Sequence, residues 1–191
     1  MGSFVVTGCA GFIGSSMVDR LLSQGHKVVG IDNFSTGLRE FLVDALKNEN
    51  FALEEKDLLD LESFSYTFKD IDAVFHFSAN ADVRSGVDRP RVDLEQNTIV
   101  THNVLEAMRV NNVKRIAFSS TGSVYGEAVQ IPTPEDVAFP IQTSLYAASK
   151  VSCEGMISAY CEGFGFQSWI FRFVSILGER YTHGHVFDFY E

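Results

Sequence analysis

The stretch TGCAGFIG, Thr7–Gly14, carries three glycines between two unlike patterns of sequence. A short β-branched run, Phe4–Thr7, leads into it, and apolar residues recur at helical spacing over Phe12–Gln24. In such a turn the first glycine permits the sharp bend. The second lets a pyrophosphate approach the backbone, and the third lets the helix pack closely on the strand. A plain glycine turn is the alternative, but the stretch predicts a sheet that begins with a dinucleotide site.

The remaining sequence alternates between strand-like and helix-like segments. Gly25 is placed to end the first helix, and Gln130–Thr143, with three of the four prolines, is predicted to be a loop. Further strands are predicted at Lys27–Ile31, Phe51–Glu55, Ala73–Phe77, Arg115–Ser119 and Trp169–Val174, and helices at Val92–Val110 and Leu145–Cys161. This alternation predicts an α/β fold, a Rossmann-type doubly wound parallel sheet with helices on both faces.

Composition narrows the classes of partner. The 191 residues are 46% hydrophobic and 21% charged, with a net charge of −10 and no basic run, which argues against binding to nucleic acid or to an anionic membrane. Three cysteines without a CxxC pair favour free thiols in a reducing compartment. With neither a signal peptide nor a membrane span in the sequence, we expect a cytoplasmic location.

An acidic residue follows the second predicted strand. Asp32 in VVGIDN stands 18 residues after Gly14, at a position where a carboxylate accepts both ribose hydroxyls of a dinucleotide. An acid there repels a 2′-phosphate, so NAD is favoured over NADP. By itself such an aspartate is commonly a turn former, and only its spacing from the glycines favours the cofactor site.

Tyr146 and Lys150, in LYAASK, lie four residues apart on one face of a predicted helix. A cation one turn away, with the positive nicotinamide of NAD⁺ nearby, would favour the phenolate and lower the tyrosine pKa from about 10. A tyrosine and a lysine at this spacing, without any other motif, more often form a solvated surface pair. Here it follows a dinucleotide fingerprint and a hydroxyl-rich strand end, SSTGSVYG, so we interpret it as catalytic. His76, within a strand, is interpreted as a core residue.

Taken in order, these motifs resemble the extended short-chain dehydrogenase/reductase family, in its NAD-dependent nucleotide-sugar epimerase/dehydratase branch. The matching segments are TGCAGFIG, IDNFSTG, KDLLD, HFSANADV, NTIVTHNVLEA, SSTGSVYG, YAASK and FRFVSILGER, which together cover nearly the whole chain. One departure is Val100, where the family usually has glycine. The other is Ser175, where epimerases usually have an asparagine that contacts the substrate phosphates.

The resemblance implies roles for particular residues. Tyr146, Lys150 and Thr121 are the implied catalytic residues, and Thr121, Ser123, Tyr146 and Ser175 the implied substrate-binding residues. The implied NAD-binding residues are Gly8, Gly11, Phe12, Ile13, Gly14, Asp32, Asn33, Ser35, Thr36, Gly37, Asp57, Leu58, Phe77, Ser78, Ala79, Ala81, Asn97, Ser119, Tyr146, Lys150 and Val174. No metal is implied, and His183 and His185 lack a third ligand at convincing spacing.

The two residues after Thr121 separate the chemistries of this branch. Dehydratases that resemble this sequence carry Asp-Glu there, and related decarboxylases carry Glu at the second position, whereas this chain has Gly122 and Ser123. The resemblance therefore implies epimerisation at C4 of a nucleotide-diphosphate sugar, of the UDP-glucose/UDP-galactose type, through a transient 4-keto sugar. A dehydratase, decarboxylase or reductase of the same family remains open, as does an NAD-binding module without turnover.

Family members continue into a C-terminal lobe that grips the nucleotide. We expect residues 1–176 to form the NAD-binding domain and residues 177–191 to be the start of the crossing into that lobe, which is largely absent. The tail aromatics Phe187, Phe189 and Tyr190 would then lack part of their packing, which suggests self-association. Family habit implies a homodimer through the helices predicted at Val92–Val110 and Leu145–Cys161.

Overall fold

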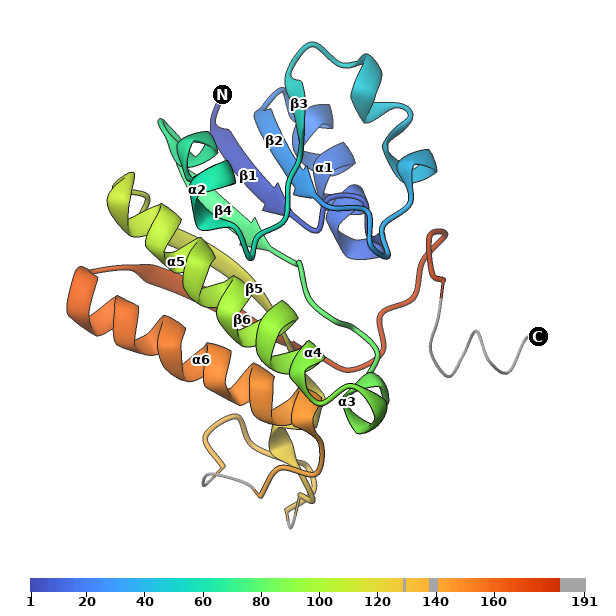
Figure 1. The fold of residues 1–191 in the computed structure, drawn as a ribbon, viewed down its shortest axis with the longest axis vertical. Coiled ribbons are helices and arrows are strands. Elements are labelled where there is room, and N and C mark those ends of the chain that lie inside the picture. The colour runs from blue at the N-terminus through green and yellow to red at the C-terminus, as the bar shows by residue number, and fades with distance from the viewer. Residues whose placement is uncertain (129, 138–140, 183–191) are drawn as a thin grey trace.

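A computed structural model of the chain describes residues 1–128, 130–137 and 141–182. Six parallel strands form one sheet in the order β3-β2-β1-β4-β5-β6 (Figure 1). The strands are β1 (Ser3–Thr7), β2 (Lys27–Asp32), β3 (Phe51–Glu55), β4 (Ala73–His76), β5 (Arg115–Thr121) and β6 (Gln167–Phe173). The strand order reverses between β1 and β4, and ligands of such sheets bind outside the carboxyl ends of the strands at this switch point. The predicted Rossmann-type sheet is confirmed.

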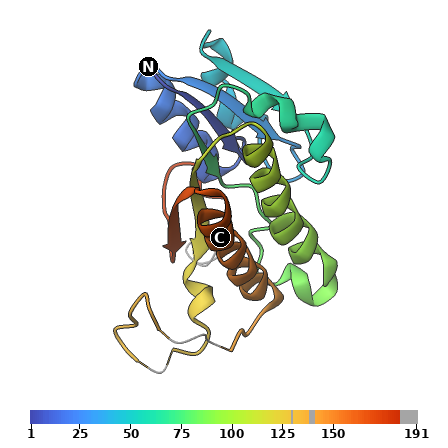
Figure 2. The same cartoon turned by 90° about the vertical axis from the view of Figure 1, so that its left-hand side faces the viewer.

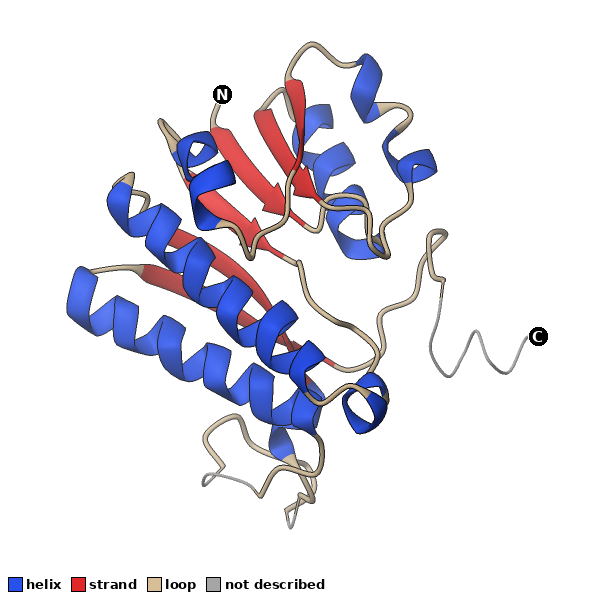
Figure 3. Ribbon diagram, in the orientation of Figure 1, coloured by secondary structure: helices blue, strands red, loops and turns tan. Residues whose placement is uncertain are grey.

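Helices fill the connections between the strands (Figure 3). They are α1 (Phe12–Ser23), η1 (Arg39–Leu42), η2 (Ala45–Lys47), α2 (Leu61–Phe64), η3 (Ser65–Phe68), α3 (Ser85–Asp88), α4 (Arg91–Asp93), η4 (Leu94–Ile99), α5 (Val100–Val110), η5 (Gly122–Tyr125) and α6 (Leu145–Phe164). No helix among the described residues is both long and apolar enough to cross a bilayer.

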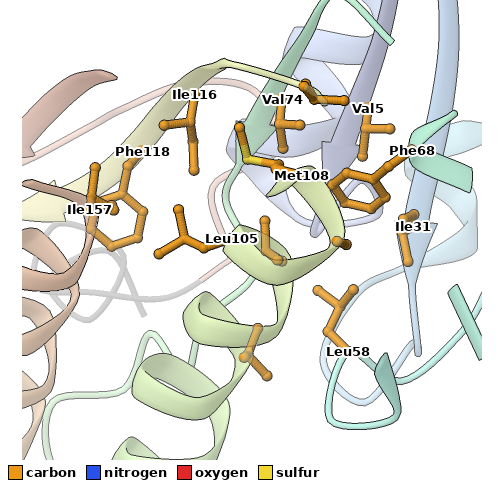
Figure 4. Packing of buried hydrophobic residues seen from close by; sticks show 14 of the residues in the cluster. Val5, Ile31, Leu58, Phe68, Val74, Leu105, Met108, Ile116, Phe118 and Ile157 are labelled. Atoms are coloured by element: carbon orange, nitrogen blue, oxygen red, sulfur yellow. The ribbon is translucent and has the colours of Figure 1, made fainter. Parts of the chain in front are cut away.

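The core lies on both faces of the sheet because neighbouring strand residues point to opposite sides. Val5 of β1 belongs to a cluster that also includes residues of α5, α6 and η3, and Figure 4 labels Leu105, Met108, Phe68 and Ile157 among them. The next residue, Val6, packs instead with α1, η1 and η2. Figure 2 shows α5 and α6 running side by side along one face. The two clusters fix the strand ends that carry the site.

Several predicted bounds differ from the structure by one to three residues, and three differences have a clear structural cause. β5 continues to Thr121, two residues beyond the prediction, because β6 pairs with it as far as Thr121 opposite Phe173. The helix predicted at Val92–Val110 holds a π-helical segment, Leu94–Ile99, before α5. α6 ends at Phe164 instead of Cys161, where Gly165 at φ 66° supplies the left-handed residue that closes a helix.

Candidate functional site

The three glycines of the first turn have three different surroundings. Gly8 has φ +66°, and a Cβ there would lie 2.8 Å from the Ser78 nitrogen on the neighbouring strand end. A Cβ on Gly14 would lie 2.0 Å from the Gly8 oxygen, so only glycine lets α1 pack on β1. On Gly11 a Cβ would meet no atom nearer than the Gly8 oxygen, at 3.3 Å. Gly11 therefore presents the open backbone that a pyrophosphate can approach.

The N-terminus of α1 opens toward the same side. Gly11 is the N-cap, no side chain caps the helix, and no acidic residue stands in its first turn. Free N–H groups and the positive end of the helix dipole therefore favour an anion here, although the chain carries a net charge of −10. The backbone at this turn fits a dinucleotide pyrophosphate.

Asp32 lies at the end of β2, next to this turn, and is 9% exposed. Its carboxylate accepts hydrogen bonds from the Ala10 nitrogen at 2.9 Å and the Phe34 nitrogen at 2.8 Å. A Cβ on Gly37 would lie 2.9 Å from one carboxylate oxygen. The side chain is thereby held in one orientation at the rim of the pocket, where the sequence places a ribose.

One pocket of about 720 Å³ runs along the carboxyl ends of the strands and gathers almost all of the predicted residues. Of the residues predicted to bind NAD, those lining it are Gly8, Gly11, Phe12, Ile13, Gly14, Asp32, Asn33, Ser35, Thr36, Gly37, Asp57, Leu58, Phe77, Ser78, Ala79, Ala81, Ser119, Tyr146, Lys150 and Val174. Thr121, Ser123 and Ser175, predicted to bind substrate, line it as well. Residues from the whole length of the chain thus share one pocket.

Asn97 is the exception, because it lies behind the pocket wall. It is 1% exposed, and its amide oxygen accepts from the Asn80 backbone nitrogen at 2.8 Å. Its amide nitrogen donates to Ser149 at 2.8 Å and to Asp93 at 3.3 Å. Asn97 therefore joins the loop after β4, the π-helical segment and α6, and the structure does not bring it into contact with the pocket.

The hydroxyl-rich strand end is built around Thr121. Its side-chain oxygen accepts from the Ser123 nitrogen at 3.1 Å and caps η5, and its hydroxyl donates to the Ser123 hydroxyl at 3.2 Å. Its geometry is therefore compatible both with a capped turn and with binding to a substrate hydroxyl. Thr121 also forms a side-chain hydrogen bond with Tyr146, so the strand end meets α6 at this residue.

Burial raises the pKa of the Tyr146 phenol, the hydrogen bond with Thr121 opposes this, and the charges of Asp93 and Cys153 add to the rise. The predicted lowering of this pKa by Lys150 together with the nicotinamide of NAD⁺ stays a prediction, because the raised pKa is that of the chain without cofactor. The Lys150 ammonium lies 6.0 Å from the Tyr146 ring centroid and donates instead to the Ser119 carbonyl at 2.9 Å.

Lys150 is 2% exposed, and burial lowers its pKa to about 8. The charges of Cys153, Asp93 and Glu154 oppose that lowering. At neutral pH the ammonium form therefore predominates, and Lys150 places a positive charge within the pocket wall, one helical turn from Tyr146.

His76 is a core residue, as predicted. It is fully buried, with its ring nitrogens 2.7 Å from the Thr7 hydroxyl and 3.1 Å from the Thr101 hydroxyl. Burial and the charge of Lys150 lower the pKa of His76 to about 3. The imidazole is consequently neutral at physiological pH and joins β4 to β1 and α5.

Several polar residues of the pocket were not among the predicted site residues, including Lys56, Asn80, Arg89 and Gln96. Arg89 and Gln96 come from the short helical region between β4 and α5, where no strand end or glycine turn marks a site. Asn80 and Lys56 lie in the family segments HFSANADV and KDLLD, but neither was assigned a role from the sequence. Among the described residues no group of three or more His, Cys, Asp and Glu side chains could hold a metal, and His183 and His185 lie outside them.

Known proteins resemble this chain in both sequence and structure. The chain is 40% identical over 160 residues to the UDP-glucose 4-epimerase of Mycolicibacterium smegmatis, covering 82% of this chain and 50% of the relative. A crystal structure of a UDP-galactose 4-epimerase matches with a TM-score of 0.88 at 40% identity, covering 98% of this chain and 61% of the other. A UDP-glucose 4-epimerase of Thermus thermophilus in complex with NAD matches with a TM-score of 0.80 at 35% identity, covering 89% and 54%.

The chain thus spans about half of the length of the curated relative and less than two thirds of both structures. A family model described as the NAD dependent epimerase/dehydratase family matches residues 4–189, which include the glycine turn, the hydroxyl-rich strand end and the Tyr146–Lys150 pair. NAD, the cofactor predicted from Asp32, is the one that this family uses. The chain belongs to the NAD dependent epimerase/dehydratase family.

Proposed function

We propose that the chain inverts the C4 hydroxyl of a nucleoside-diphosphate sugar with NAD as a recycled cofactor. UDP-glucose and UDP-galactose are the first pair to test. The observation that carries this proposal is the end of the pocket, where Tyr146 is hydrogen-bonded to Thr121 and Lys150 lies beside them. The activities named for the similar proteins support the same reaction.

The cofactor has a matching set of residues along the pocket. The backbone from Gly8 to Gly14 would hold the pyrophosphate, Asp32 the adenosine ribose, and Lys150 the nicotinamide ribose. When bound, NAD supplies the acceptor for the C4 hydride and a positive ring beside Tyr146. These roles rest on the open backbone at Gly11 and on the fixed carboxylate of Asp32.

Tyr146 would remove the proton from the sugar O4 hydroxyl, and Thr121 would orient that hydroxyl by a hydrogen bond. Because burial raises the pKa of Tyr146, the phenolate needs positive charge nearby. Lys150, mostly an ammonium at neutral pH, supplies part of it. Tyr146 would also return the proton to O4 when the hydride that NAD supplies is given back to the opposite face of C4, so the sugar would lose no atom.

Elimination is the competing chemistry of the family, and it needs an acid and a base next to Thr121. Gly122 and Ser123 provide no carboxylate, and the Ser123 hydroxyl is engaged with Thr121. The next acidic residue in the sequence is Glu127. Epimerisation is therefore the reaction that we favour over dehydration or decarboxylation.

The homodimer and the domain boundary after residue 176 stay predictions.

The test has two steps. The purified chain is denatured and the released cofactor is identified by mass spectrometry, with NAD expected in near-equimolar amount. The native chain is then incubated with UDP-galactose and a panel of other nucleotide sugars, and we expect UDP-glucose from UDP-galactose. A 4-keto-6-deoxy product would contradict epimerisation in favour of a dehydratase, and NAD without turnover of any sugar would leave a binding module.

A further inference from the structure

An ion pair joins α6 to β6, one helical turn along α6 from Lys150. Arg172 of β6 donates from Nη2 to Glu154 Oε2 at 2.8 Å and from Nε to Glu154 Oε1 at 3.1 Å. The two side chains are 28% and 14% exposed. Glu154 follows Tyr146 and Lys150 at four-residue spacing, so the three form one stripe along α6.

Each residue of this stripe contacts a different one of the last three residues of β5. Lys150 donates to the Ser119 carbonyl at 2.9 Å, and the Ser120 hydroxyl donates to Glu154 Oε1 at 2.5 Å. Tyr146 forms its hydrogen bond with Thr121. Ser120 is 4% exposed, so its contact with Glu154 is a buried link between the strand end and α6.

Arg172 carries the same connection outward to the loop that follows Thr121. Its guanidinium lies 4.9 Å from the ring centroid of Tyr125, and Nη1 donates to the Glu135 carbonyl at 2.9 Å. One ion pair thus joins α6 and β6 to the strand end, to η5 and to the loop drawn in yellow in Figure 1.

We propose that Arg172 and Glu154 are positioning residues that hold Thr121 and η5 in register with Tyr146, and this inference rests on the proposed function. A partly buried ion pair adds little net stability when compared with apolar side chains of similar size. A forked guanidinium contact does add fixed geometry, which lysine does not reproduce. The pair is placed where that geometry governs the distance between a sugar hydroxyl and its base.

Two variants remove parts of this connection while conserving size. Arg172→Lys keeps the charge but loses the fork, and Ser120→Ala removes the contact of the strand end with Glu154 and leaves the ion pair. Arg91→Lys is the matched control, because Arg91 donates from two nitrogens to Glu95 on an exposed helix surface outside the pocket.

Turnover tests the proposal first. We expect both variants to retain NAD and to reduce it with UDP-galactose about tenfold more slowly in a single turnover, because small misplacements of reacting groups are costly. Since the Thr121 hydrogen bond lowers the pKa of Tyr146, against burial, Asp93 and Cys153, loosening it shifts the pH profile of the reduction to higher pH. Lys150 is the other charged group near the phenol, with its ammonium nitrogen 6.0 Å from the Tyr146 ring centroid. An unshifted profile with an unchanged rate would overturn the proposal.

Hydrogen exchange tests the connection without any turnover. Amides of residues 119–128 should exchange faster in Arg172→Lys and Ser120→Ala than in the unmodified chain or Arg91→Lys, while those of β1 and α1 stay unchanged. If the unmodified chain reduces no NAD with any nucleotide sugar, the proposed function fails, and the exchange result still decides whether the ion pair orders the strand end. Equal exchange in all four proteins would overturn the inference.

Discussion

In the half of the sheet formed by β1–β3 and α1, main-chain contacts shape the pocket, whereas in the half formed by β4–β6 and α6 side chains from distant segments do so. At the first turn, the Gly8 oxygen would lie 2.0 Å from a Cβ on Gly14, so the geometry depends on the lack of a side chain. In the other half, the end of β5 is held by polar atoms of Tyr146, Lys150 and Glu154. Substitutions that add side-chain atoms should therefore damage the half with β1–β3 and α1, and substitutions that remove polar atoms should damage the half with β4–β6 and α6.

The largest expected effect is a deletion in the second half. Tyr146→Phe removes the phenol that would take the O4 proton, and general acid–base groups contribute about 10²–10⁴ in rate. We expect the rate at which UDP-galactose reduces bound NAD, followed by absorbance, to fall about 10³-fold. The NAD content should not change, because the glycine turn is untouched. Normal turnover by this variant would exclude Tyr146 as the base.

An addition in the first half should instead act on folding. Gly14→Ala forces the α1 and β1 backbones apart, and we expect a loss of roughly 3 kcal/mol or more in the free energy of unfolding, measured by urea denaturation. Gly11→Ala is the matched control. Its Cβ meets the Gly8 oxygen only at 3.3 Å, so stability should change little while NAD binding is lost. Equal stability of the two variants would break the comparison.

A pH effect comes from the buried cation. The pKa of Lys150 is about 8 in the folded chain and about 10.5 in an unfolded one, so between these values the unfolded chain binds the extra proton. Stability from this group therefore rises with pH from 8 to 10.5 and is lost as pH falls through 8.

Lys150→Met removes that dependence and leaves the other titrating groups in place. We expect its advantage in unfolding free energy over the unmodified chain to shrink by on the order of 2 kcal/mol between pH 7.5 and pH 10. Urea titrations of both proteins at the two pH values measure this difference. A constant difference would mean that Lys150 titrates normally.

The smallest effect separates backbone strain from close packing within the first half. Gly25 has φ +77°, and a Cβ added to it would meet no atom within 4 Å, so Gly25→Ala meets only the cost of the left-handed conformation. We expect a loss of about 1 kcal/mol in the free energy of unfolding and no change in NAD content. A loss as large as that of Gly14→Ala would show that the left-handed backbone at Gly25 costs as much as crowding does at Gly14.

The same contrast explains what could be predicted from the sequence. The glycine turn, Asp32 and the strands follow local sequence patterns. The bounds of β1, α1, β2 and β3 were therefore predicted to within one residue. The partners that the side chains of Asn97 and Glu154 contact lie up to 52 and 34 residues away, and no local spacing encodes them. The predicted fifth strand stopped at Ser119, two residues before Thr121, because the place of Thr121 in β5 depends on pairing with β6. The rise in the pKa of Tyr146 could not be predicted, because burial, its largest cause, depends on the whole fold.

The most direct measurement uses UDP-galactose that carries deuterium at C4, given to the chain as purified without added NAD. The product is analysed by NMR and mass spectrometry. If the hydrogen removed from C4 returns to the opposite face of the same carbon, UDP-glucose will form with the deuterium still at C4. UDP-glucose without deuterium at C4, or no product from a chain that contains NAD, would contradict the account.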